Sequence, residues 1–228
     1  AETGNVQCFS CIDRNDGGCL KNRVGTVTCN PDEKCAETIT TIETSHNQTN
    51  ILTKGCGDGR LENTLEDFTF HGINAYIRSS QCNGSFCNTN LKTDQNESSD
   101  TEYSNPNGVQ CYSCIGNRGG ECSTLKASVV NCYSKYRFCF DGNVTLTIGN
   151  FSAVIPLKSC SRTSRCPVQM FSSNEVTLKI KGACCEGNLC NQDLSNKTQY
   201  TDLSPLVPLD ELVTKNTSIS STSVPEMS

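Results

Sequence analysis

The chain has 228 residues, a net charge of −5, no tryptophan and only 6% aromatic residues. Its pI is near 5.1 and its mean hydropathy is −0.43, which argues against nucleic acid or another polyanion as a partner, because such partners need clustered Lys and Arg. Eighteen cysteines are typical of small secreted domains whose few apolar residues cannot form a sufficient core without disulfides.

The cysteines form two arrays with the same spacing. The first array consists of Cys8, Cys11, Cys19, Cys29, Cys35, Cys56, Cys82 and Cys87. Each recurs 103 or 104 residues later, at Cys111, Cys114, Cys122, Cys132, Cys139, Cys160, Cys185 and Cys190. The second array has two further members, Cys166 and Cys184. The chain is therefore an internal duplication in which each copy keeps the same covalent frame.

The duplication predicts the domain boundaries. Residues 1–5 are expected to be a lead-in, in which Ala1-Glu2-Thr3-Gly4 is typical of a vector remnant left after signal cleavage. We expect copy one at 6–92, an acidic and polar linker at 93–108, and copy two at 109–193. Residues 194–228 lack cysteine and contain several Ser, Thr and Pro residues. This composition favours a solvated, glycosylated stalk over a merely disordered terminus.

The hydrophobic pattern predicts strands. Val144, Leu146 and Ile148 alternate with polar residues, as do Val176, Leu178 and Ile180, which is the period of half-buried strands. In copy one, 38–42 and 51–54 form a weaker pair around an expected hairpin tip at 45–48. Residues 61–70 leave room for one helical turn. The sequence thus predicts an all-β, disulfide-rich protein.

Seven Asn-x-Ser/Thr sequons predict N-glycosylation in a secreted chain. They begin at Asn47, Asn83, Asn96, Asn143, Asn150, Asn196 and Asn216. Three of them, at Asn47, Asn143 and Asn150, lie around the central hairpins of the two copies. Glycans there would shield those faces and direct protein partners to other surfaces, or would themselves be bound by a lectin.

The residues do not favour catalysis or a cofactor. The Cys-x-x-Cys pair near the start of each copy occurs in zinc and redox sites, but the even number of thiols and the lack of a βαβ pattern favour structural disulfides. The only histidines are His46 and His71, and their absence from copy two excludes a duplicated histidine-dependent active site. We expect no enzyme activity, no metal, no cofactor, and a packing or surface role for His71.

Each copy ends with Cys-x4-Cys-Asn, at Cys82 to Asn88 and at Cys185 to Asn191. Together with Cys-x-x-Cys at the start, this spacing resembles the three-finger domains of the lymphocyte-antigen-6/urokinase-receptor (LU) family. The resemblance implies two tandem three-finger domains. It also implies that Asn88 and Asn191 are structural amides, which hydrogen-bond the backbone near the first strand of each copy.

The sequence alone leaves the cysteine pairing open, because even eight cysteines permit many connectivities. The resemblance implies four bridges in copy one, Cys8–Cys35, Cys11–Cys19, Cys29–Cys56 and Cys82–Cys87. It implies five in copy two, Cys111–Cys139, Cys114–Cys122, Cys132–Cys160, Cys166–Cys184 and Cys185–Cys190.

Copy one lacks a counterpart of the Cys166–Cys184 bridge, so its third finger, roughly 57–81, is expected to be held only at its ends. That finger carries the apolar residues Phe68, Phe70, Ile73, Tyr76 and Ile77. These side chains either pack against the second domain or a partner, or complete the core of the first domain. The sequence leaves both interpretations open.

The resemblance also implies a function. Family membership predicts a cell-surface glycoprotein in the outer leaflet, held by a GPI anchor beyond Ser228 or shed, which binds extracellular protein or matrix ligands in adhesion, migration or signalling. Partners implied by the resemblance are laminins, a galectin and anterior-gradient proteins. Urokinase binding is not expected, because two domains cannot form the three-domain ring of the family's urokinase receptor. The alternative is a soluble tandem-domain inhibitor of a secreted enzyme such as a phospholipase.

Overall fold

The computed structural model describes residues 4–91, 105–116, 122–173 and 176–193. Its first copy contains six strands, β1 (Gln7–Asp13), β2 (Gly25–Thr28), β3 (Lys34–Glu43), β4 (Gln48–Gly57), β5 (Thr64–Phe70) and β6 (Ile73–Cys82). The second copy contains β7 (Pro106–Ile115), β8 (Ser128–Tyr133), β9 (Phe138–Ile148), β10 (Phe151–Ser161), β11 (Gln169–Ser172) and β12 (Val176–Cys185). The prediction of an all-β protein is confirmed.

Each copy forms one antiparallel sheet with the same topology. The strand order is β2-β1-β4-β3-β6-β5 in the first copy and β11-β12-β9-β10-β7-β8 in the second. The hairpins β1–β2, β3–β4 and β5–β6 are the three fingers of the first copy. Two expectations differ from the structure: residues 64–70 form β5 rather than a helical turn, and residues 106–108 of the expected linker belong to β7. The rest of that linker and the expected stalk at 194–228 lie outside the described residues.

Nine disulfides join all eighteen cysteines, with the partners that the family pairing implies. In the first copy the half-cystines Cys8, Cys29 and Cys35 are buried together at the base of the fingers. Bridges of this kind contribute about 2 to 4 kcal/mol each by the chain-entropy model. The covalent base therefore substitutes for the large apolar core that a domain of this size cannot form by itself.

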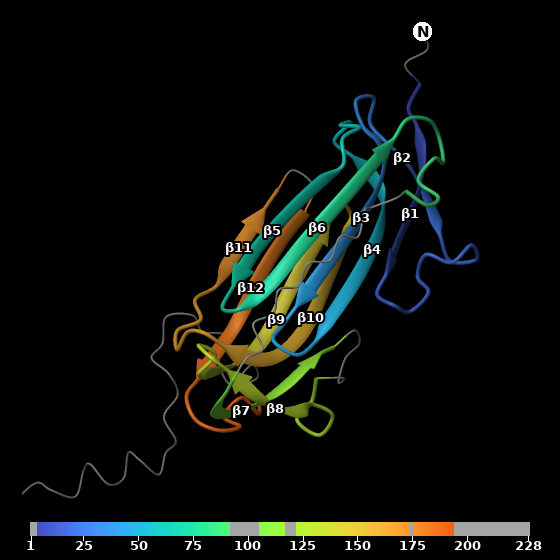
Figure 1. Ribbon diagram of the computed structural model, residues 1–228. Coiled ribbons are helices and arrows are strands. Elements are labelled where there is room, and N and C mark those ends of the chain that lie inside the picture. Colours follow the sequence, from blue (N-terminus) through green and yellow to red (C-terminus); the bar gives the residue numbers. More distant parts are fainter. Residues whose placement is uncertain (1–3, 92–104, 117–121, 174–175, 194–228) are drawn as a thin grey trace, which may run out of the picture.

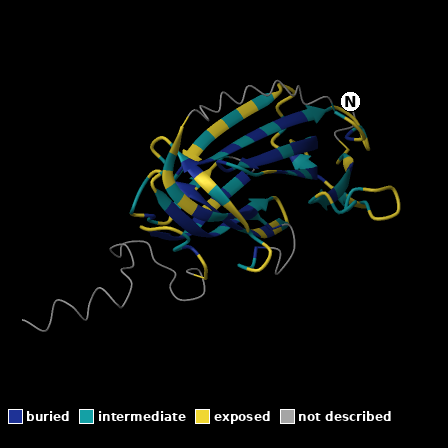
Figure 2. Cartoon of the chain, turned by 60° about the horizontal axis from the view of Figure 1, so that its bottom comes forward, coloured by how far each residue is buried: buried dark blue, intermediate teal, exposed yellow. Residues whose placement is uncertain are grey.

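The two sheets pack face to face (Figure 1). Alternate residues of β9 and β12 turn toward the first sheet, and their side chains form one core with apolar residues of β3, β4 and β6. The members from the first copy are Ile42, Ile51, Ile73, Ala75 and Ile77, and those from the second include Phe140, Val144, Leu146, Leu178 and Ile180. Buried segments accordingly concentrate along the middle of the strands, while loops and outer faces are exposed (Figure 2).

A buried asparagine closes the base of each copy. Asn191 is 0% exposed; its Oδ1 accepts a hydrogen bond from the Tyr112 amide at 2.9 Å, and its Nδ2 donates to the carbonyls of Tyr112 and Phe140. Asn88 makes the equivalent three contacts to Phe9 and Ala36. The side chain thus ties the end of each copy to its first strand and its central strand.

A buried lysine holds the same segment from the other side. The Lys54 ammonium lies 2.9 Å from Glu37 and donates to the carbonyls of Asn88 and Thr89. In the second copy, Lys158 lies 2.9 Å from Asp141 and donates to the carbonyls of Asn191 and Gln192. Because each ammonium has a carboxylate and two carbonyls as partners, its burial costs far less than that of an unpaired charge.

We expect Asn191→Ala to destabilise the second copy by about 3 kcal/mol or more, because it leaves three buried backbone groups without partners at roughly 1 to 3 kcal/mol each. Chemical unfolding of the purified chain measures this loss of stability, and the secretion yield of each variant is a second measurement. The exposed neighbouring residue offers a control, Gln192→Ala, which should unfold like the parent chain. Equal unfolding midpoints for the two variants would contradict a structural role for Asn191.

Candidate ligand-binding site

The third finger of the first copy lies over the third finger of the second. The Phe68 and Phe171 rings are stacked, with centroids 4.1 Å apart and planes at 19°. Ile73 and Ile77 are buried in the common core, and Phe68 and Phe70 pack against it. These four of the five apolar residues noted in the sequence therefore face the second copy.

Tyr76 is different from these four residues. Because side chains alternate along β6, it points to the opposite face of the sheet from Ile73 and Ile77. Burial raises its pKa, and the nearby Glu43 carboxylate raises it further. Tyr76 thus belongs to the outer surface of the first sheet, next to Asp67 in the register of β5 and β6.

Both histidines lie in the seam between the copies. The His71 ring is stacked on Phe140 at 6.0 Å, and its Nε2 is 2.9 Å from the Pro167 carbonyl. The His46 ring is stacked on Tyr133 at 5.6 Å, and its Nδ1 is 2.8 Å from the Ser45 hydroxyl. Burial lowers the pKa of both imidazoles, opposed in each case by a smaller effect of a backbone hydrogen bond.

The Ser45–His46 contact does not make a catalytic site. Ser45 is only 8% exposed, the imidazole is stacked on Tyr133, and its backbone hydrogen bond is with Asn131 rather than with a carboxylate that could orient a base. Nor do the closest sets of metal-ligand atoms form a metal site in the described residues. They are the sulfurs of Cys8, Cys29 and Cys56 and of Cys111, Cys132 and Cys160, which are in disulfides and therefore offer no thiolates.

The tips of the second fingers pack reciprocally. The tip of the first copy reaches the first strand of the second, where Asn47 Nδ2 donates to the Ser113 hydroxyl at 2.6 Å. The tip of the second copy, with Asn150 and Phe151, lies over the first copy near Ser10. The glycosylation predicted at Asn47 would use the nitrogen that makes the contact with Ser113. Glycosylation at Asn47 stays a prediction.

The other sequons of the described residues have different surroundings. Asn83 is exposed, and its Oδ1 accepts a hydrogen bond from Lys34. Asn150 is exposed in the β9–β10 turn, and Asn143 is half-buried on the outer face of β9. Glycosylation at these three positions stays a prediction. The predicted sites at Asn96, Asn196 and Asn216 lie outside the described residues.

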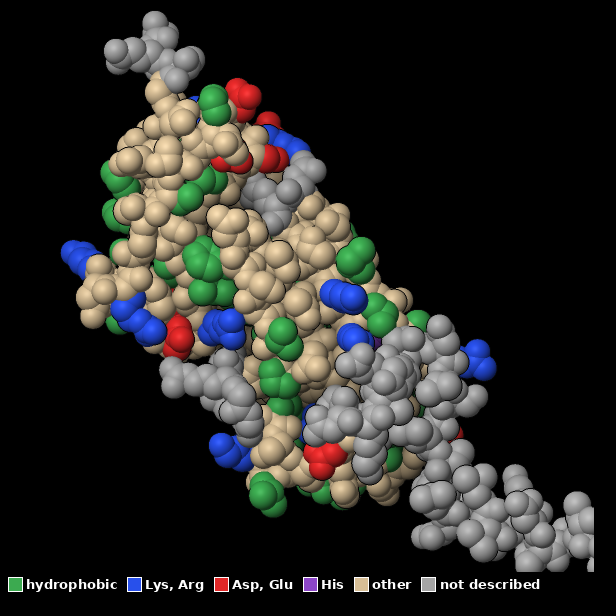
Figure 3. Space-filling view, turned by 180° about the vertical axis from the view of Figure 1, so that it is seen from behind, with side chains coloured by type: hydrophobic (Ala, Val, Ile, Leu, Met, Phe, Trp, Pro, Cys, Tyr) green, Lys and Arg blue, Asp and Glu red, His purple; other side chains and the backbone are tan. Residues whose placement is uncertain are grey.

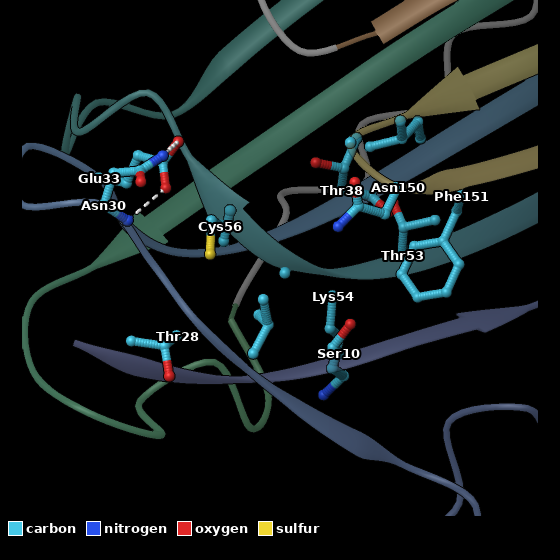
Figure 4. Close-up of a pocket in the computed structure, with 15 residues that line it drawn as sticks. Ser10, Thr28, Asn30, Glu33, Thr38, Thr53, Lys54, Cys56, Asn150 and Phe151 are labelled. Atoms are coloured by element: carbon cyan, nitrogen blue, oxygen red, sulfur yellow. Dashed lines mark hydrogen bonds between the residues drawn. The ribbon is translucent and has the colours of Figure 1, made fainter. Parts of the chain in front are cut away.

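Two hollows open where the second-copy tip meets the first copy. One, of about 270 Å³, lies on the inner face of the first sheet and is lined by polar residues such as Thr38 and Thr53 (Figure 4). The other is an open groove of about 780 Å³ along the first finger, lined by Arg14, Asp16 and Arg23 among others. Phe151 stands between the two hollows and lines both.

The first finger that forms the groove is held in a fixed shape. The Asp13 carboxylate accepts hydrogen bonds from the backbone amides of Asp16, Gly17 and Cys19. A Cβ at Gly18 would lie 1.9 Å from the Ile12 carbonyl, so no larger residue fits there. Sequence reasoning missed this finger, although Asp13 and the Asp16-Gly17-Gly18 run are a turn signal that could have indicated it.

A family model for the u-PAR/Ly-6 domain matches residues 4–90 and 107–193. The chain belongs to the u-PAR/Ly-6 family. It is 35% identical over 211 residues to Ly6/PLAUR domain-containing protein 3 of Mus musculus, covering 89% of this chain and 57% of that protein. It is 29% identical over 189 residues to the urokinase plasminogen activator surface receptor of Mus musculus, covering 82% and 54%.

This u-PAR/Ly-6 chain therefore spans little more than half the length of these relatives. Among solved structures it is similar to the crystal structure of mouse TEX101, with a TM-score of 0.52, 20% identity, and coverage of 79% of this chain and 98% of that one. At this identity the likeness supports the fold alone. The recognition of the family from its cysteine spacing is confirmed.

We expect acid to destabilise the packed copies through the two histidines. Because their folded-state pKa is lowered, the unfolded chain binds more protons in acid. Their stabilising contribution is complete above about pH 6.5, the ordinary pKa, and is lost as the pH falls from there through the lower folded-state pKa. Thermal unfolding of the u-PAR/Ly-6 chain at pH 7.5 and 5.5 measures this effect. Both pH values lie above the ordinary pKa values of carboxyl groups.

The matched variant is His46→Gln/His71→Gln, which cannot gain these two protons. The difference in unfolding temperature between pH 7.5 and 5.5 should shrink in this variant relative to the parent chain. An unchanged difference would mean that other groups cause the pH dependence.

Proposed function

We propose that this chain is the ligand-binding extracellular part of a GPI-anchored, glycosylated cell-surface protein, and that it acts in adhesion, migration or signalling without catalysis. Membership of the u-PAR/Ly-6 family supports this proposal, as does similarity to a protein named as a surface receptor. No helix in the described ranges is long and apolar enough to span a membrane.

The observation that carries the proposal is the preorganised groove of the first finger. Arg14 and Arg23 bring positive charge to a groove of about 780 Å³, and the Arg23 guanidinium is fixed by a 2.8 Å hydrogen bond to the Asp16 carbonyl. A loop that is already rigid loses little conformational entropy when it binds. Guanidinium groups bind carboxylates with two parallel hydrogen bonds, so the groove suits an acidic segment of a protein ligand.

Figure 3 shows the molecule from behind, where most of the surface is neutral and polar, with small groups of hydrophobic, basic and acidic side chains. Isolated apolar residues on such a surface need no partner. The groove combines a hollowed shape with two positively charged side chains, Arg14 and Arg23, and one negatively charged side chain, Asp16.

Laminins, a galectin and anterior-gradient proteins are the proposed candidates for partners, by family resemblance. Binding of urokinase to these two domains alone is not expected, since two three-finger domains enclose no three-domain cavity. A galectin would bind a glycan rather than the groove, so enzymatic deglycosylation should abolish galectin binding and leave groove-dependent binding intact.

The charge of the groove gives the first test. We expect Arg14→Glu/Arg23→Glu to weaken binding of the ectodomain to an immobilised laminin by about tenfold or more, as loss of charge-assisted contacts at an interface does. Arg137 is exposed on the second copy, so Arg137→Glu is the matched charge reversal and should bind normally. Biolayer interferometry measures both. Equal loss in the two variants, or none, would contradict the groove as the binding site.

The anchor gives the second test. Phosphatidylinositol-specific phospholipase C should release the full-length protein from the surface of cells that express it. Protein that is secreted freely, with no enzyme-sensitive surface pool, would instead support a soluble inhibitor.

A further inference from the structure

The apolar core between the sheets covers only part of the inner face of the first sheet, and the rest of that face is polar and buried, with Thr38 3% exposed and Thr53 2% exposed. The β9–β10 hairpin ends at Gly149 and Asn150, short of the disulfide base of the first copy. Thr38 pairs with Thr53, and Ala36 pairs with Gly55, in the register of β3 and β4. By the two-residue period of strands, these four residues share the face of Ile42 and Ile51, yet none of them is in the common apolar core.

This polar part of the inner face lines the smaller hollow, of about 270 Å³. Its volume is just below the roughly 300 Å³ at which pockets for drug-sized ligands begin, so it has room for one or two sugar rings. The lining combines hydroxyl, amide and carboxylate groups, from Ser10, Thr28, Asn30 and Glu33, with the Phe151 ring at its edge. Sugars need both kinds of group, because their hydroxyls both donate and accept hydrogen bonds while their C–H faces pack on aromatic rings.

The chain itself carries a sugar-attachment site at the edge of this hollow. Asn150-Phe151-Ser152 is a sequon, and both Asn150 and Phe151 line the hollow. Asn150 is the second residue of a two-residue turn whose first residue, Gly149, has φ +53°, so the hairpin fixes its direction. Figure 4 shows the Asn150 side chain beside Thr38 and Thr53, with its amide nitrogen toward the hollow.

The corresponding tip of the first copy gives the contrast. There the sequon residue comes one position after the turn, and Asn47 meets Ser113 directly through its amide nitrogen. Asn47 is half-buried at that contact. At the other tip Asn150 is exposed, and its nitrogen is near a polar hollow rather than bonded to a side chain of the other copy.

We propose that the N-glycan of Asn150 folds back into this hollow, where its first sugar residues contact Thr28, Asn30 and the Phe151 ring. The glycan then fills the hollow beside the polar part of the inner face, while the second sheet packs against the apolar part. The proposal rests on the export and glycosylation of the chain proposed above. Site occupancy, measured first by peptide mass spectrometry, separates failure of that premise from failure of the glycan to bind in the hollow.

The test compares two glycans in one protein. The chain is produced in mammalian cells, treated natively with peptide:N-glycosidase F in ¹⁸O-water, and analysed by site-resolved mass spectrometry. Release at Asn150 should be about tenfold slower than at the exposed Asn83, because the enzyme must wait for the sugar to leave the hollow. After reduction and denaturation the two sites should react alike.

Gly55 offers a variant that fills the hollow. A Cβ at this position meets nothing within 4 Å, and its strand pairing places it on the face of the hollow. Gly55→Leu should therefore displace the glycan and raise native release at Asn150 to the rate at Asn83, with Gly55→Ala in between. Thr69→Leu, at an exposed position of the opposite edge strand β5, is the control and should keep the slow release.

Three results would overturn the proposal: an unglycosylated Asn150 in the exported protein, equal native release at Asn150 and Asn83, or slow release that survives Gly55→Leu. Thermal unfolding of each variant shows whether it is folded. If Gly55→Leu unfolds near the parent temperature and loses protection, the hollow is the glycan site.

Discussion

Face-to-face packing of the two sheets is the contact on which the rest of the molecule depends. Alternate residues of β3, β4 and β6 meet alternate residues of β9, β10 and β12, and together they form the one large apolar cluster of the described residues. Neither copy could form such a core alone, since each sheet has only one apolar face. The copies therefore form one body, in contrast to tandem domains that are joined by a linker alone.

The packing of the two sheets supports the third finger of the first copy, which has no disulfide equivalent to Cys166–Cys184. In the second copy Cys166–Cys184 joins the third finger to its base, and both half-cystines are buried in the common core. In the first copy Gln81 takes the position of Cys184, and its side chain hydrogen-bonds Asp58 and Gly59. Farther along the finger, the Phe68 ring stacks on Phe171 of the second copy. An aromatic pair contributes roughly 0.5 to 1.5 kcal/mol beyond its buried area, less than the about 2 to 4 kcal/mol of a disulfide. The third finger of the first copy thus relies on the second copy for support.

The fold could be predicted from the sequence because the spacing of the cysteines is typical of the family. The family resemblance then implied which cysteines pair in disulfides. The contacts between the two copies could not be predicted. They depend on how two curved sheets fit together, and the spacing of the cysteines carries no information about that fit. Tyr76 shows the limit of composition. Composition groups it with the apolar residues Ile73 and Ile77, whereas the two-residue period of a strand places it on the other face of β6. Similarly, both histidines lie in the seam, and nothing near them in the sequence indicates it.

The two finger tips show how a shift of one residue changes the chemistry of a sequon. When the asparagine follows the turn, as Asn47 does, its amide lies against the other copy and bonds Ser113. When it is in the turn, as Asn150 is, its amide stays exposed and extends past the last paired residues of the hairpin. A sequon motif alone treats both as equal acceptors. Because the copies pack reciprocally, the tip of the second finger makes a protein contact through its sequon in one copy and leaves its sequon exposed in the other.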